Sequence, residues 1–215
     1  MPLSELEFGS FLAYTPRPTR EPGMASKNWM YQLKTNALVG HPPQTTASLI
    51  ALRLANRLDE VPFKAWLDGT ALAVPVPKST LARPGSLWVP YHLCEALREA
   101  GLVADVAILL ERIHAVPKAA ISLPQNRANV DAHYHSLGVR PGLAVPERIL
   151  LVDDIITRGA ALFASAMRLA EAFPATRIYG FTAMRTISDE AKFKGISDPC
   201  CGTVTRKGDQ THREP

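Results

Sequence analysis

The stretch Arg148–Leu162, RILLVDDIITRGAAL, decides the fold of this chain. Its apolar beginning, Arg148–Val152, ends at two consecutive acids, Asp153 and Asp154. An apolar run of this kind is typical of a strand that is buried on both faces, as in a parallel sheet. After two more apolar residues comes a polar turn that opens a helix expected over Gly159–Phe173. The stretch therefore predicts a strand, a short turn and a helix.

The turn, Thr157-Arg158-Gly159-Ala160, has features that a phosphate group requires. Backbone N–H groups at a helix N-terminus converge on an anion, and the helix dipole favours negative charge there. Gly159 allows a close approach of the backbone, and the Thr157 hydroxyl can donate a hydrogen bond. Asp153 and Asp154 can accept from ribose hydroxyls or hold Mg²⁺ through water. A sugar phosphate is the expected ligand, and the alternative is a plain turn with a helix-capping acid.

Strands and helices alternate on both sides of this stretch. The expected strands are 70–76, 103–110, 148–152 and 177–184, and the expected helices are 28–38, 44–58, 86–99 (with Ser86 as N-cap), 125–132 and 159–173. This alternation predicts a Rossmann-like α/β fold with a parallel sheet, whose ligands lie at the carboxyl ends of the strands. Residues 28–185 are the expected domain, with an N-terminal arm (1–27) and a partly flexible C-terminal extension (186–215). These two segments could form either a small hood or a dimer contact.

The composition excludes several classes of protein. Hydrophobic residues make up 47% of the 215 residues and charged residues 20%, which is enough apolar material for a core. No apolar run reaches the roughly 18–20 residues that span a bilayer, and the N-terminus lacks a signal pattern, so a cytoplasmic protein is expected. The net charge of +4 favours anionic partners and leaves nucleic acid open. Cys94, Cys200 and Cys201 form no disulfide framework and include no CxxC pair for zinc.

The central stretch resembles the phosphoribosyl-pyrophosphate (PRPP) motif of the type I phosphoribosyltransferases, in which four apolar residues, two acids and two apolar residues precede Thr-Thr/Ser-Gly-Ala/Thr. The resemblance implies that Asp153 and Asp154 hold the ribose hydroxyls together with Mg²⁺. It also implies that four residues surround the 5′-phosphate: Thr157, Arg158, Gly159 and Ala160. Two positions depart from the motif, since Arg158 stands where a small hydroxyl residue is usual and Ala161 where Thr often follows.

Looser similarities extend over about residues 28–184. AVPVPKS (73–79) resembles the pyrophosphate-binding strand and loop of these enzymes, which implies Lys78 and Ser79 as donors. Several positions resemble the ComF-like, competence-associated branch of the family: Tyr31–Lys34, Glu111-Arg112, Lys118, Gln125–Arg127 and Asn129-Val130. That branch commonly begins with a cysteine-rich zinc ribbon, which this sequence lacks, and its Arg-Gly-Phe-Asn stretch appears here only as RPGS (83–86).

The resemblance implies a Mg²⁺-dependent phosphoribosyltransferase that binds PRPP or a nucleoside monophosphate and forms a homodimer. Such an enzyme transfers a phosphoribosyl group to a nitrogenous base, or releases it from a nucleotide, with pyrophosphate as the leaving group. The expected catalytic residues are Asp153, Asp154, Lys78 and Arg127, with Arg112 as a further pyrophosphate-binding residue. The alternative is a non-catalytic module with the same pocket, which senses PRPP or a nucleotide or assists DNA handling. His133 and His135 lack accompanying ligands and are not expected to hold a metal.

Overall fold

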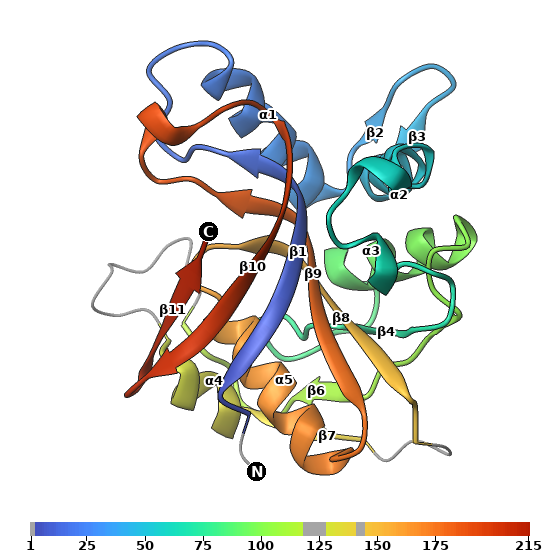
Figure 1. The fold of residues 1–215 in the computed structure, drawn as a ribbon, viewed down its shortest axis with the longest axis vertical. Helices are drawn as coiled ribbons and strands as arrows, with labels where there is room; N and C mark the ends of the chain where they lie inside the picture. Colours follow the sequence, from blue (N-terminus) through green and yellow to red (C-terminus); the bar gives the residue numbers. More distant parts are fainter. Residues whose placement is uncertain (1–2, 118–127, 141–144) are drawn as a thin grey trace.

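The computed structural model describes residues 3–117, 128–140 and 145–215. A seven-stranded sheet runs through the molecule (Figure 1), and its strands in spatial order are β11 (Gln210–Glu214), β10 (Ser197–Lys207), β1 (Glu5–Tyr14), β9 (Arg177–Thr186), β8 (Arg148–Ile156), β4 (Leu72–Pro75) and β5 (Asp105–Val106). The strands from β1 to β5 in this order are parallel, whereas β10 and β11 are antiparallel to their neighbours. The mostly parallel sheet confirms the predicted α/β class.

Helices cover both faces of the sheet. The helices α1 (Gly23–Thr35), α2 (Thr46–Asn56) and α3 (Val89–Glu99) pack on one face. The helices α4 (Val130–His135) and α5 (Ala160–Ala172) pack on the other, beside the two-stranded pair β6 (Leu110–Arg112) and β7 (Leu137–Val139). Smaller elements complete the chain: β2 (Leu38–Val39), β3 (Gln44–Thr45), and 3-10 turns at Leu58–Glu60, Lys64–Trp66 and Glu190–Lys192.

Strand β8 separates two hydrophobic cores, as its apolar sequence predicts. Leu150 and Val152 pack into the core beneath α1, α2 and α3. Ile149 and Leu151, which point the opposite way, pack into the core beneath α4 and α5. Because alternate side chains are buried on opposite faces, the strand needs apolar residues at every position.

The expected N-terminal arm over residues 1–27 is wrong for its first half. Strand β1 lies inside the sheet between β9 and β10, and its residues Leu6 and Phe8–Ala13 are buried. Its opening, ELEF, alternates acids with apolar side chains, which is the pattern of a strand with one polar and one buried face. The arm was expected from the prolines of residues 15–23, which lie in the loop that follows β1.

The expected frayed C-terminus is also wrong, because β10 and β11 form a hairpin there. Gly208 adopts a φ of 64° in its turn, between the paired residues Lys207 and Gln210. A glycine next to Asp209, flanked by residues of high strand propensity, is a hairpin signal. The hairpin extends the central sheet beyond β1 (Figure 1).

Three predicted elements have different bounds. The expected strand 103–110 divides into β5 and the start of β6, which lie in different sheets. Helix α3 begins at Val89 with Trp88 at its N-cap, because Ser86 instead donates to the carbonyl oxygen of Arg83 in a turn. The expected helix 125–132 falls partly outside the described residues, and α4 begins at Val130 after the N-cap Asn129. None of the helices in the described ranges has the length and apolar character that crossing a bilayer requires.

Candidate functional site

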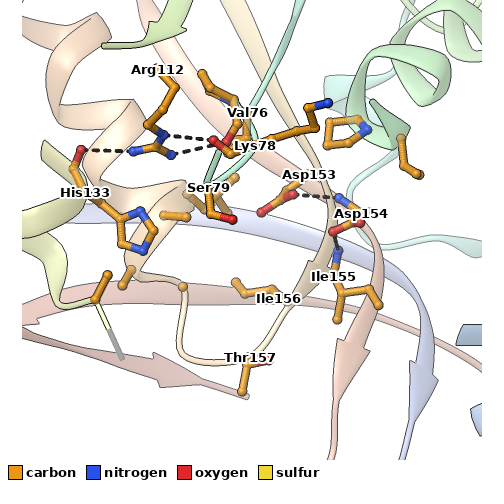
Figure 2. Close-up of a pocket in the computed structure, with 18 of the residues that line it drawn as sticks. Val76, Lys78, Ser79, Arg112, His133, Asp153, Asp154, Ile155, Ile156 and Thr157 are labelled. Atoms are coloured by element: carbon orange, nitrogen blue, oxygen red, sulfur yellow. Dashed lines mark hydrogen bonds between the residues drawn. The ribbon is translucent and has the colours of Figure 1, made fainter. Parts of the chain in front are cut away.

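A cavity of about 570 Å³ lies where β4 and β8 end (Figure 2). It brings together most of the predicted site residues: Lys78, Ser79, Arg112, Asp153, Asp154, Thr157, Arg158, Gly159 and Ala160. Lys34 of α1 and His133 of α4 also line it, and neither was predicted as a site residue. Arg127, predicted as catalytic, lies outside the described residues.

The two acids lie within β8, which continues to Ile156 rather than ending at Val152 as predicted. Strand β4 accompanies β8 only as far as the pair Pro75–Val152, whereas β9 continues alongside β8 to its end. From Asp153 onward the β4 side of the strand is therefore unpaired, and this edge opens into the cavity. The acids stand at the first positions that β4 no longer covers.

Hydrogen bonds from the backbone hold both carboxylates. Asp153 Oδ1 accepts from the N–H of Asp154 at 2.8 Å, and Asp154 Oδ1 accepts from the N–H of Ile155 at 2.7 Å (Figure 2). Lys34 Nζ donates to Asp154 Oδ2 at 2.6 Å. Burial and the neighbouring charge of Asp154 raise the pKa of Asp153, and Lys34 opposes this effect. The ammonium group of α1 therefore compensates part of the charge that two adjacent acids concentrate here.

The two acids fit a magnesium ion that is held jointly with a substrate. Mg²⁺ usually keeps several waters and takes one or two carboxylates together with substrate oxygens. Oδ2 of Asp153 accepts no hydrogen bond from the described part of the chain, so it remains an open ligand. Within the same residues no cluster of three or more His, Cys, Asp or Glu side chains could hold a metal ion.

The turn between β8 and α5 requires glycine at position 159 for two reasons. Gly159 has a φ of 85°, which side-chain-bearing residues rarely adopt, and it stands at the N-cap of α5. A Cβ atom there would lie 2.8 Å from Cγ2 of Val204 in β10. The Thr157 hydroxyl is 3.1 Å from the hydroxyl of Thr186, and the Arg158 guanidinium donates to Gln210 Oε1 at 3.3 Å. The backbone N–H groups are thus the principal anion donors that this turn offers.

The second loop of the site follows β4, and its backbone is fixed by Arg112. This side chain is buried, and it donates to the carbonyl oxygens of Lys78 (2.9 Å) and Pro77 (3.2 Å) and to the Ser136 hydroxyl. Burial lowers the pKa of Arg112 to about 10. In this structure the donors of Arg112 bond the loop carbonyl oxygens and Ser136, and its role in binding pyrophosphate stays a prediction.

Lys78 also points away from its predicted role in this structure. Its Nζ donates to the Ser86 hydroxyl at 2.6 Å and to the Leu87 carbonyl oxygen at 3.1 Å. The lysine is a flexible cation that can exchange these neutral acceptors for an anionic one. Ser79 lies beside it at the cavity wall (Figure 2).

His133 is a neutral polar group in the wall of the cavity, next to Arg112. Burial and the nearby Arg112 charge lower the pKa of His133 to about 4. Its Nδ1 atom is buried and has no hydrogen-bond partner among the residues described. The sequence offered no signal for this position, because His133 reaches the cavity only through the packing of α4.

The chain was compared with protein-family models, with curated proteins and with solved structures. No protein-family model matches it, and neither does any curated protein. A solved structure that it resembles is a hypoxanthine phosphoribosyltransferase from Trypanosoma cruzi, with 13% identity and a TM-score of 0.30 over 82% of this chain and 88% of the other.

Proposed function

We propose that this protein binds PRPP with Mg²⁺ and transfers its phosphoribosyl group to a nitrogenous base, or catalyses the reverse release from a nucleotide. One observation carries the proposal: two adjacent acids, a glycine turn at a helix N-terminus and a lysine-bearing loop line a single cavity. These groups match the three chemical parts of PRPP, which are a diol, a phosphate monoester and a pyrophosphate.

Each part of the ligand has a matching partner in the cavity. The 5′-phosphate would lie against the N–H groups of residues 157–160, where the dipole of α5 favours an anion. The ribose hydroxyls would donate to Asp153 and Asp154. The pyrophosphate would lie along the loop after β4, where Lys78 and the backbone near Ser79 are the available donors.

Catalysis by this site would consist mainly of charge stabilisation. When bound with the substrate, Mg²⁺ would neutralise charge on the departing pyrophosphate. Asp153 and Asp154 would hold the ribose hydroxyls while its C1′ atom becomes oxocarbenium-like. Arg112 would act through the loop backbone that it fixes, and Lys34 would orient Asp154 through its hydrogen bond to Oδ2.

A non-catalytic binding module is the second candidate, and the hydrogen bonds that Arg112 and Lys78 make favour it. Arg112 donates to the carbonyl oxygens of Pro77 and Lys78 and to Ser136, and Lys78 donates to neutral oxygens of Ser86 and Leu87. A protein that only senses PRPP or a nucleotide needs the pocket but not a cation at the leaving group. This module would bind PRPP without releasing pyrophosphate.

Thermal unfolding with and without ligand tests the proposal. PRPP with Mg²⁺ at about 100 times its dissociation constant should stabilise the protein by about 2.7 kcal/mol. In Asp154→Asn the Mg²⁺-dependent part of this gain should disappear, while Asp59→Asn, at an acid that is 98% exposed, should retain it. Ribose 5-phosphate, AMP and GMP serve as comparison ligands.

The melting shift and the release of pyrophosphate together decide between the two candidates. A PRPP-dependent shift accompanied by pyrophosphate release in the presence of a free base supports the transferase, and a shift without release supports the sensor. No shift with any of these ligands, or an unchanged shift in Asp154→Asn, would contradict the proposed site.

A further inference from the structure

The C-terminal hairpin β10–β11 lies directly behind the turn at residues 157–160. None of its described residues lines the cavity, yet several of its side chains contact the backbone of residues 156–159 from the other side. Val204 packs against Gly159, Thr211 donates to the carbonyl oxygen of Arg158, and Arg213 donates to that of Ile156. The hairpin therefore supports the turn without entering the site.

The bond from Arg213 sets the first peptide plane of the turn. Arg213 Nη1 donates to the Ile156 carbonyl oxygen at 2.9 Å, and Nη2 donates to the Thr186 carbonyl oxygen at 2.7 Å. In a trans peptide the C=O of one residue and the N–H of the next point in opposite directions. With the Ile156 carbonyl directed at the hairpin, the N–H of Thr157 points away from the hairpin.

The bond from Thr211 sets the third peptide plane in the same sense. Thr211 Oγ1 donates to the Arg158 carbonyl oxygen at 2.8 Å. By the same geometry the N–H of Gly159 also points away from the hairpin. Two N–H groups on one side of a tight turn form a concave anion site of the kind that binds phosphate.

The far end of the hairpin is fixed as well. At the turn of the hairpin, Asp209 accepts from the N–H of Val130 (3.1 Å) and from Asn129 Nδ2 (3.0 Å). Arg206 pairs with Asp131 at 3.0 Å. The hairpin is thus anchored on α4 at its tip and on the sheet along its length, which makes it a rigid base for the turn.

We infer that Thr211 and Arg213 are positioning residues that aim the N–H groups of Thr157 and Gly159 at the ligand's phosphate monoester. This inference rests on the proposed function, since it assigns the phosphate end of that ligand to the turn. It predicts an effect confined to the monoester, because the loop that would take the pyrophosphate makes no hydrogen bond to the hairpin among the described residues.

Calorimetric titration of the full chain with ribose 5-phosphate, and separately with pyrophosphate and Mg²⁺, tests this role. Thr211→Val keeps the shape of the side chain but removes the donor, so ribose 5-phosphate should bind about tenfold more weakly. Arg213→Met should weaken it at least as much, and pyrophosphate affinity should stay within about twofold. Thr211→Ser, which restores the hydroxyl, should recover the affinity.

Thr205→Val is the matched control, because Thr205 lies on the same hairpin and its hydroxyl makes none of the hydrogen bonds to the turn. Melting temperatures identify variants that fail to fold, and Thr211→Val alone then decides the matter if Arg213→Met unfolds. Unchanged ribose 5-phosphate affinity in Thr211→Val, an equal loss for both ligands, or no recovery in Thr211→Ser overturns the inference. Wild-type protein that binds neither ligand refutes the proposed function itself, and the inference fails with it.

Discussion

Replacing Gly159 by alanine is expected to destabilise the protein through two separable effects. Gly159 has a φ of 85°, and an added methyl group would lie 2.8 and 3.0 Å from the two Cγ atoms of Val204. The left-handed backbone costs a residue with a Cβ about 1–2 kcal/mol. Overpacking against a buried side chain adds about 1–3 kcal/mol. The expected loss in the free energy of unfolding is therefore about 3 kcal/mol.

Differential scanning calorimetry measures this loss. For a chain of this size each kcal/mol lowers the melting temperature by about 2–4 °C, so Gly159→Ala should melt about 6–12 °C below wild type. Gly208→Ala is the matched control, because Gly208 has a φ of 64° and no atom within 4 Å of an added Cβ. This control carries only the backbone cost, and its melting temperature should fall by about 2–8 °C.

A double variant separates the two effects. Val204→Ala removes both atoms that an alanine at position 159 would meet, so in that background Gly159→Ala should cost only its backbone part. The sum of the single losses should then exceed the loss of the double variant by about 1–2 kcal/mol. Strict additivity, or a Gly159→Ala protein that melts with Gly208→Ala, would refute the packing argument.

Two further predictions concern the walls of the cavity. Arg112→Met leaves the carbonyl oxygens of Pro77 and Lys78 without their buried donor, and urea denaturation should show that the free energy of unfolding falls by about 2–4 kcal/mol. The control Arg140→Met removes an exposed partner of Glu111 and should lower it by less than about 1 kcal/mol. Equal losses in the two variants would contradict the role given to Arg112. The pKa of His133 is about 4 in the folded protein against 6.5 in the unfolded chain, so the unfolded state binds more protons and stability falls as the pH drops from about 6.5 to 4. His133→Asn should make this decline shallower by about 1 kcal/mol per pH unit, whereas parallel pH profiles would show that His133 is not the titrating group.

The sequence predicted the part of the fold in which local pattern and burial agree. The segment from β8 to α5 has apolar residues where both faces of the sheet are covered and small residues where the chain turns. Its structure can therefore be predicted from the local sequence. The same reasoning placed Asp153, Asp154 and Gly159 at one cavity, because the carboxyl ends of parallel strands meet at one edge.

The residues that the sequence did not reveal depend on contacts between distant segments. Lys34 reaches Asp154 across 120 positions, and Arg213 reaches Ile156 across 57. Nothing in the spacing of either residue marks its partner. Arg112 was predicted correctly at the cavity, but only the folded chain shows that carbonyl oxygens take up its donors.

The place of β1 in the sheet has a consequence for how the chain folds as it is synthesised. Its neighbours are β9, which pairs Gly180 with Phe8, and β10, which pairs Thr205 with Glu5. Translation at about 5–20 residues per second reaches these partners on the order of ten seconds or more after β1 has been made. Contacts so far apart in sequence carry a high loop-closure entropy and slow the folding rate. Until then the apolar side chains of β1 have no sheet to cover them, so β1 takes its place in the sheet long after it has been made.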